Sequence, residues 1–167
     1  MLRYLFALFL CMSVAGCGFQ LRGTSGDTLT LERVHVGPAN RFPELRRELE
    51  RQLRQNGTDI VAESDAATVL ELVEQRTGRR PVTSTGSGST ARYELDLEVT
   101  FSVRRADSVL LAPTALSSQR TYSFDPESLV GNSEEEELLT SEMRRDVAFR
   151  ILRHVDAVVR DAAEAGP

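Results

Sequence analysis

Residues 93–104 read Tyr-Glu-Leu-Asp-Leu-Glu-Val-Thr-Phe-Ser-Val-Arg, and this stretch decides the fold. Apolar and polar side chains alternate without a break, which is the period of a β-strand with one buried face and one wet face. The side chains predicted to be buried are Tyr93, Leu95, Leu97, Val99, Phe101 and Val103. A strand of this length needs a second layer of structure to cover its apolar face.

The segments on either side predict three more strands. Arg105-Ala106-Asp107-Ser108 predicts a tight turn, after which residues 109–124 return antiparallel to the first strand. Pro113 lies in this returning strand, and proline is tolerated there only at a sheet edge or a bulge. Upstream, residues 29–36 and 68–75 are rich in β-branched side chains and partly alternate, so each predicts a strand.

Two segments predict amphipathic helices. Residues 43–55 begin with proline and end before Asn56-Gly57, and their leucines recur at helical spacing. A second helix is expected from Ser133 to about Ala163, because Ser133-x-x-Glu136 is a capping-box pattern. We read the acidic run at its start as a helix terminus rather than a metal site. The expected core stripe is Leu139, Met143, Val147, Ile151, Val155, Val158 and Ala162.

The element order β-α-β-β-β-α predicts an α+β fold. Each predicted helix has one apolar stripe, and the clearest predicted strand has one apolar face. A two-layer sandwich buries all of these apolar surfaces. We therefore expect both helices on one face of a mainly antiparallel four-stranded sheet, within a single domain over residues 29–163. Residues 164–167 would form a short tail. The other face of the sheet should be polar, wet and free to meet a partner.

Residues 1–16 predict a lipoprotein signal peptide. Arg3 precedes an apolar run of roughly ten residues, which is too short to span a bilayer as a helix. Val14-Ala15-Gly16-Cys17 then fits the lipoprotein cleavage and lipidation signal. The alternative is an ordinary signal peptide with an incidental thiol at Cys17, although that cleavage prefers an A-x-A-like site.

Lipidation of Cys17 would give the mature chain a permanent anchor. The expected groups are an S-diacylglycerol and an N-acyl chain, and stable anchoring needs only two acyl chains. Residues 17–28 would then form a lipidated tether that leads to the domain, and its residues 23–28 are polar. Gly18 stands where inner-membrane lipoproteins usually carry Asp, which indicates the outer membrane and its inner leaflet.

The charge and composition of the mature chain exclude some classes of function. Without Arg3 it would carry 19 basic and 25 acidic residues, and this acidity argues against a general nucleic-acid binder. All the basic residues are Arg, and tryptophan is absent, which weakens a carbohydrate-stacking role. No cofactor motif or mature cysteine pair for a metal is present.

The sequence contains no motif of an enzyme. His35 and His154 stand on a predicted strand and a predicted helix with no catalytic pattern near them, so we expect surface or packing roles. We infer a non-enzyme. A hydrolase would require folding to bring a serine together with one of these histidines in a pocket.

Residues 77–90 are dominated by Ser, Thr and Gly and predict a mobile loop. Four arginines and no acid lie between Gln75 and Tyr93, namely Arg76, Arg79, Arg80 and Arg92. Arginine binds phosphates through two parallel hydrogen bonds, so this local charge of +4 predicts a phosphate-binding site. The alternative is a solvated loop whose charge serves only solubility.

Several short motifs resemble the family of LPS-assembly lipoproteins, LptE. Cys17-Gly18-Phe19-Gln20-Leu21-Arg22-Gly23 resembles the mature N-terminus of that family, and Arg51 to Gly57 resembles the end of its first helix. Ala91-Arg92-Tyr93 and Phe124-Asp125-Pro126 fall at the expected places. From the motif only Cys17 carries an assignable role, that of lipid attachment.

This resemblance implies a function in the outer membrane. Members sit as a plug inside the LptD β-barrel, help that barrel to fold and help deliver lipopolysaccharide (LPS) to the outer leaflet. The arginine segment would suit the phosphates of lipid A. The alternative is an outer-membrane lipoprotein that binds peptidoglycan or another periplasmic partner.

Overall fold

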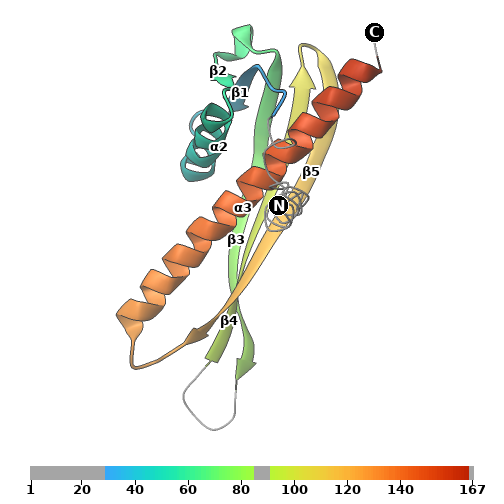
Figure 1. Ribbon diagram of the computed structural model, residues 1–167. Coiled ribbons are helices and arrows are strands. Elements are labelled where there is room, and N and C mark those ends of the chain that lie inside the picture. Colours follow the sequence, from blue (N-terminus) through green and yellow to red (C-terminus); the bar gives the residue numbers. More distant parts are fainter. Residues whose placement is uncertain (1–28, 85–90, 166–167) are drawn as a thin grey trace, which may run out of the picture.

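The structure is a computed structural model that describes residues 29–84 and 91–165 (Figure 1). Within these ranges the chain forms one mixed five-stranded sheet, two α-helices and a short 3₁₀ helix at Glu63–Asp65. In chain order the elements are β1 (Arg33–Gly37), α2 (Pro43–Gln55), β2 (Asp59–Ile60), β3 (Thr68–Ser84), β4 (Ala91–Arg105), β5 (Ser108–Phe124) and α3 (Leu129–Glu164).

The sheet has the strand order β2-β1-β3-β4-β5. The three long strands β3, β4 and β5 are antiparallel, whereas β1 is parallel to both β2 and β3. The predicted α+β class is confirmed, but the predicted count of four strands is wrong by one. Strand β2 has two residues, and the sequence showed only a short apolar piece there. A strand this short has no period to detect and exists because Asp59 and Val61 donate backbone hydrogen bonds to Glu32 and Val34.

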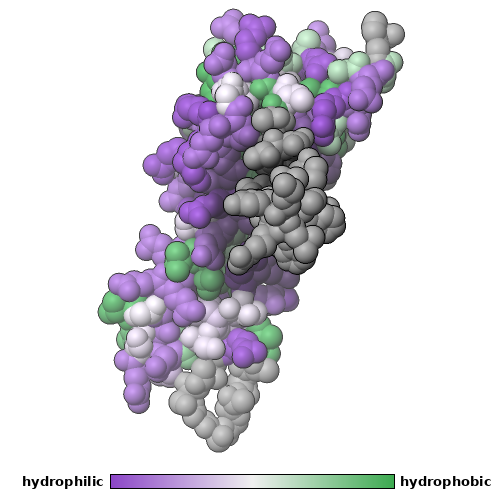
Figure 2. Space-filling view, in the orientation of Figure 1, coloured by the Kyte–Doolittle hydropathy of each residue, from purple (hydrophilic) through white to green (hydrophobic). Residues whose placement is uncertain are grey.

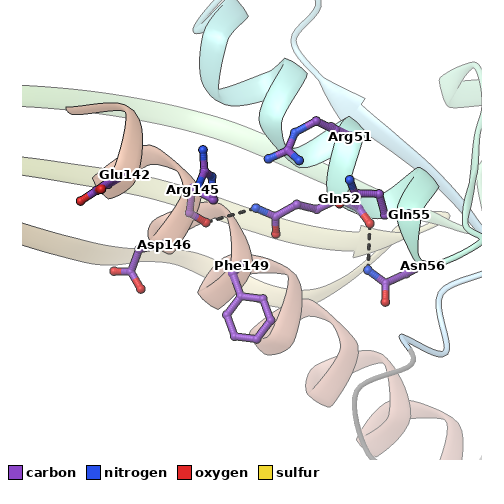
Figure 3. Close-up of a pocket in the computed structure, with 8 residues that line it drawn as sticks. All are labelled: Arg51, Gln52, Gln55, Asn56, Glu142, Arg145, Asp146 and Phe149. Carbon is purple, nitrogen blue, oxygen red and sulfur yellow. Dashed lines mark hydrogen bonds between the residues drawn. The ribbon is translucent and has the colours of Figure 1, made fainter. Parts of the chain in front are cut away.

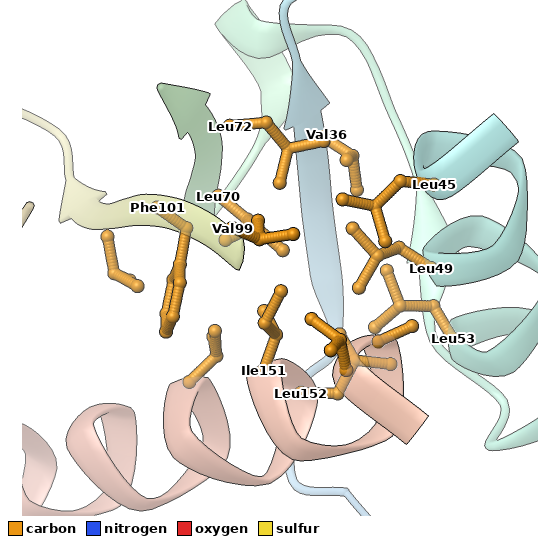
Figure 4. Packing of buried hydrophobic residues seen from close by; sticks show 14 of the residues in the cluster. Val36, Leu45, Leu49, Leu53, Leu70, Leu72, Val99, Phe101, Ile151 and Leu152 are labelled. Carbon is orange, nitrogen blue, oxygen red and sulfur yellow. The ribbon is translucent and has the colours of Figure 1, made fainter. Parts of the chain in front are cut away.

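Both helices pack on one face of the sheet, as predicted. Helix α3 crosses the long strands diagonally, and α2 lies beside it near β1 and β2 (Figure 1). Leu45, Leu49 and Leu53 from α2 meet Ile151 and Leu152 from α3 in a buried cluster (Figure 4). The sheet contributes Leu70, Leu72, Leu95, Leu97, Val99, Phe101 and Val103 to the same cluster. The alternation read from residues 93–104 therefore identified the buried face of β4 correctly.

The mobile loop predicted for residues 77–90 is wrong over residues 77–84. Strand β3 continues to Ser84 and pairs with β4 along its whole length, with Arg80 opposite Glu94 and Ser84 opposite Ala91. A register shift between Pro81 and Thr83 accommodates the proline. Strand propensity depends strongly on context, and the long partner β4 supplies hydrogen bonds that local composition does not reveal. Residues 85–90 lie outside the described residues.

Helix α3 begins at Leu129, four residues before the predicted start at Ser133. The Ser133 hydroxyl donates to the carbonyl of Leu129 inside the helix, so Ser133 is not the N-cap. Glu136 is likewise not part of a capping box but bonds to Tyr122. The placement predicted for Pro113 is confirmed, since it lies in the edge strand β5 beside a register shift.

Candidate interaction surface

The face of β3, β4 and β5 that points away from the helices is polar, and we call it the open face. Alternate residues of β4 place Glu94, Asp96, Glu98 and Thr100 on it, between side chains of the two neighbouring strands. The neighbours on this face include Glu74, Arg76 and Arg80 from β3 and Ser117, Gln119 and Thr121 from β5. The predicted wet face is confirmed, and it offers hydrogen-bond donors, acceptors and both signs of charge.

Ion pairs within β3 and between β3 and β4 organise the open face. Arg76 contacts Glu74 at 2.9 Å and Glu98 at 3.6 Å, and the Nε of Arg80 donates to Glu94 at 2.9 Å. Between these pairs the Asp96 carboxylate lies over Gly78. It occupies the space that the Cβ of any other residue at position 78 would need. The charges of this face are therefore largely balanced within it.

Arg79 lies on the other side of β3, toward the helices. Its guanidinium carbon is 4.1 Å from the centroid of the Tyr93 ring and within 6 Å of the Tyr122 and Phe124 rings. Its Nη1 is 3.4 Å from a carboxylate oxygen of Glu136 on α3. We call these five residues the aromatic cage; they join three strands to the first turns of α3.

The aromatic cage also holds the Tyr122 hydroxyl. This hydroxyl donates a hydrogen bond of 2.8 Å to Glu136, and the side chain is almost fully buried. Burial and the negative charge of Glu136 both disfavour the phenolate, so they raise the pKa of Tyr122 to about 12.

The four predicted site arginines do not form one patch. Arg76 and Arg80 lie on the open face, and Arg92 lies on the same face by strand alternation, whereas Arg79 is in the aromatic cage. The predicted local charge of +4 is wrong, because Glu74, Glu94, Glu98 and Glu136 pair with three of the arginines. Glu74 lies next to the segment on the same strand, whereas strand register brings Glu94 and Glu98 to the arginines and helix packing brings Glu136. Phosphate binding by these arginines stays a prediction.

The two histidines have packing roles, as predicted. The Nδ1 of His35 is 3.0 Å from the carbonyl of Val61, and the His154 ring meets the Phe101 ring edge to face at 6.0 Å. Across the described ranges no group of His, Cys, Asp and Glu could hold a metal ion. Neither described helix is apolar enough over a sufficient length to cross a membrane.

This architecture defines a class of protein: a two-layer α+β domain with helices on one side and a polar sheet face on the other. The model of the LptE lipopolysaccharide-assembly family matches residues 31–155. The chain belongs to this family.

Relatives agree with that assignment. The chain is 28% identical over 142 residues to the LPS-assembly lipoprotein LptE of Photorhabdus laumondii, covering 84% of this chain and 78% of that one. It is 27% identical over 154 residues to the protein of the same name from Pectobacterium atrosepticum, covering 89% and 83%.

Solved structures have the same fold. Rare lipoprotein B from Shewanella oneidensis superimposes with a TM-score of 0.69 at 29% identity, covering 79% of this chain and 99% of that one. Lipoprotein B from Nitrosomonas europaea superimposes with a TM-score of 0.70 at 24% identity, covering 89% and 97%, and so supports the fold alone. By family, the protein belongs to LPS assembly in outer-membrane biogenesis. Cys17 lies outside the described residues, and its lipidation stays a prediction.

Proposed function

We propose that this protein is anchored through lipidated Cys17 to the inner leaflet of the outer membrane and fills the lumen of the LptD β-barrel. In that position it would assist barrel assembly and the delivery of LPS to the outer leaflet, without catalysis. The open face is the observation that supports this proposal most directly. A polar sheet face whose opposite side carries both helices suits a polar, wet barrel interior.

The dimensions of the sheet agree with such a role. Strand β4 has 15 residues, so it extends about 50 Å at the usual rise per residue. The apolar band of an outer-membrane barrel is about 25 Å tall. The open face is therefore long enough to run through a barrel and still extend beyond it on one side.

Co-purification tests the partner. A tagged copy solubilised in mild detergent should recover a large outer-membrane barrel, identified by mass spectrometry. Replacing Thr100 and Gln119 on the open face by Trp should reduce that recovery at least fivefold, while the same change at exposed Glu164 should not. Recovery of the wild-type protein as a free monomer would contradict the proposal, and binding to peptidoglycan sacculi would favour the alternative partner.

We further propose that Arg76, Arg80 and Arg92 bind phosphates of LPS on the open face. Arg92 has no ion-pair partner among the described residues, whereas a phosphate must displace carboxylates from Arg76 and Arg80. Arg79 would act indirectly, because the aromatic cage holds its guanidinium on the opposite side of the sheet.

Charge reversal separates LPS binding from barrel association. Arg80→Glu with Arg92→Glu should weaken binding of purified LPS about tenfold or more, because two cations become anions beside the ligand. Arg104→Glu is the matched control, since strand alternation places it on the same face about 40 Å away. Barrel co-purification should persist in all variants. Unchanged LPS affinity of the double variant would eliminate these arginines as the site.

A further inference from the structure

Strand β5 forms one edge of the sheet, and half of this edge is regular enough to accept another strand. Among the described strands, β2 at the opposite edge has only two residues, whereas β5 has 17. From Ser108 to Pro113 the edge is blunted, because the pairing with β4 shifts register twice there and proline has no N–H. From Thr114 to Phe124 the register is continuous. A further strand could therefore pair with residues 114–124.

Two hydrogen bonds show which backbone groups of this regular half point outward. The Nη1 of Arg150 donates to the Ser117 carbonyl at 2.7 Å, and the Nη1 of Arg120 donates to the Gln119 carbonyl at 2.8 Å. In an antiparallel pair the N–H and C=O of one residue point to the same side, and that side alternates along the strand. The outward backbone groups are therefore those of Ala115, Ser117, Gln119, Thr121 and Ser123, whose side chains are all exposed.

These outward groups form a template for strand addition. An extended segment that pairs with them satisfies N–H and C=O groups that now meet water or an arginine side chain. Free sheet edges are commonly protected by charged side chains, yet Arg120 is the only charged residue from Thr114 to Phe124. The edge is thus protected over one half and left available over the other.

The charge beside the available half favours an acidic partner. Arg120 has no ion-pair partner among the described residues, and Arg150 makes only a loose contact of 3.7 Å with Asp146. Asp146 lies at the rim of the polar hollow between α2 and α3 (Figure 3). Hydrophilic side chains cover most of the side of the molecule seen in Figure 2, which disfavours an apolar partner.

The spacing of the two arginines matches an added strand. The carbonyls that they hold belong to Ser117 and Gln119, two residues apart, which corresponds to about 7 Å along the strand. Side chains at alternate positions of an extended segment lie on one side with the same spacing. Two carboxylates at such positions can therefore meet Arg120 and Arg150 together.

We propose that the edge of β5 over residues 114–124 binds an extended acidic segment of a partner polypeptide by strand addition. Backbone hydrogen bonds supply the affinity, and carboxylates at alternate positions draw Arg120 and Arg150 away from the two carbonyls and fix the register. A closed barrel has no free strand edge, so this contact is separate from the one proposed for the open face. The inference depends neither on the barrel nor on LPS.

Binding of a synthetic peptide tests the proposal. The probe is a fluorescein-labelled peptide in which Thr and Glu alternate, added to the full-length protein in detergent and followed by fluorescence anisotropy. Thr121→Pro removes one outward N–H and leaves the pairing with β4 intact, so it should weaken binding at least fivefold. Thr121→Ala keeps that N–H and is the matched control, which should bind as the wild type does.

Charge exchange tests the acidic character of the partner. Arg120→Glu with Arg150→Glu should weaken binding of the Thr-Glu peptide at least tenfold, because both cations become anions beside the ligand. A peptide with Lys in place of Glu should bind this double variant at least tenfold more tightly than it binds the wild type. Equal binding of both peptides to both proteins would overturn the assignment of the two arginines.

Hydrogen exchange measured by NMR separates strand addition from simple charge attraction. With saturating Thr-Glu peptide, the outward amides of β5 should exchange at least fivefold more slowly. The same peptide with every amide N-methylated cannot donate to β5 and should neither bind nor slow exchange; this control leaves the protein unaltered.

Three results would overturn the proposal. The first is failure of the wild type to bind the peptide, and the second is binding without slower exchange of the outward amides. The third is slower exchange that appears with protein concentration alone, which would identify a second copy of the chain as the occupant. Barrel co-purification is measured separately, so failure of either proposal is recognisable without the other.

Discussion

Arg79 shows how tertiary contacts give one side chain its role. Three aromatic rings surround its guanidinium, and Glu136 binds it from α3. Arg80, the next residue, points to the open face and makes an exposed ion pair with Glu94. A cation over an aromatic ring contributes about 0.5–1 kcal/mol when partly exposed, whereas an exposed ion pair contributes little.

The two neighbouring arginines should therefore differ in their effect on stability. Arg79→Ala is expected to lower the free energy of unfolding by about 1–2 kcal/mol, because ring contacts and the Glu136 pair are lost together. Arg80→Ala should change it by less than about 0.5 kcal/mol. Urea denaturation followed by circular dichroism measures both values, and equal effects would argue against the aromatic cage as a stabilising cluster.

Tyr122 predicts how stability changes at high pH. The folded protein keeps the phenolic proton up to a pKa of about 12, whereas the unfolded chain releases it near 10. The stabilisation is therefore complete below pH 10 and is lost as the pH rises from 10 toward 12. The free energy of unfolding should fall more steeply over that range in the wild type than in Tyr122→Phe, and identical slopes would contradict the assignment.

At the scale of elements, the connection from β5 to α3 depends on Asn132. Its side chain accepts a hydrogen bond from the backbone N–H of Asp125 at 3.0 Å and donates to the carbonyl of Asp125 at 2.6 Å. Asn132 is buried within the first turn of α3. These two bonds fix the chain reversal that places α3 back across the sheet.

Removing the Asn132 amide should destabilise the fold. Asn132→Ala leaves the backbone N–H of Asp125 without its partner and removes one of the two hydrogen bonds to the Asp125 carbonyl, which still accepts from the backbone N–H of Ser128. Each such loss costs about 1 kcal/mol or more. We expect a loss of about 2 kcal/mol in the free energy of unfolding by chemical denaturation. Asn40→Ala, at an exposed position after β1, is the control and should have little effect.

For the whole molecule, a single cluster of buried side chains joins both helices to the sheet. Leu49 of α2 and Leu97 of β4 are both fully buried in it. Small domains with one core usually unfold in one cooperative transition. The helical layer and the sheet should therefore not unfold separately.

Two core substitutions test whether the helical layer and the sheet unfold in one transition. Leu49→Ala and Leu97→Ala should each lower the free energy of unfolding by about 2–5 kcal/mol through lost burial and a remaining cavity. Both should shift the same single transition, whether helix or β-sheet signal is followed. Separate transitions for the two signals would show that α2 is not part of the common core.

The amino-acid sequence by itself determined the features that repeat along the chain. The alternation in residues 93–104 identified the buried face of β4. The leucine spacing in residues 43–55 identified α2, and Pro43 and Asn56-Gly57 marked its bounds. These periods follow from local backbone geometry, so they can be read without knowing any partner. The α+β class followed from their order.

Only the tertiary structure decided the features that depend on distant partners. Strand β2 and the second half of β3 form because β1 and β4 offer hydrogen bonds to segments with weak local preference. Strand register brought Glu94 to Arg80, and helix packing brought Glu136 to Arg79. Such contacts join residues far apart in the chain, and no local pattern encodes which residues will meet.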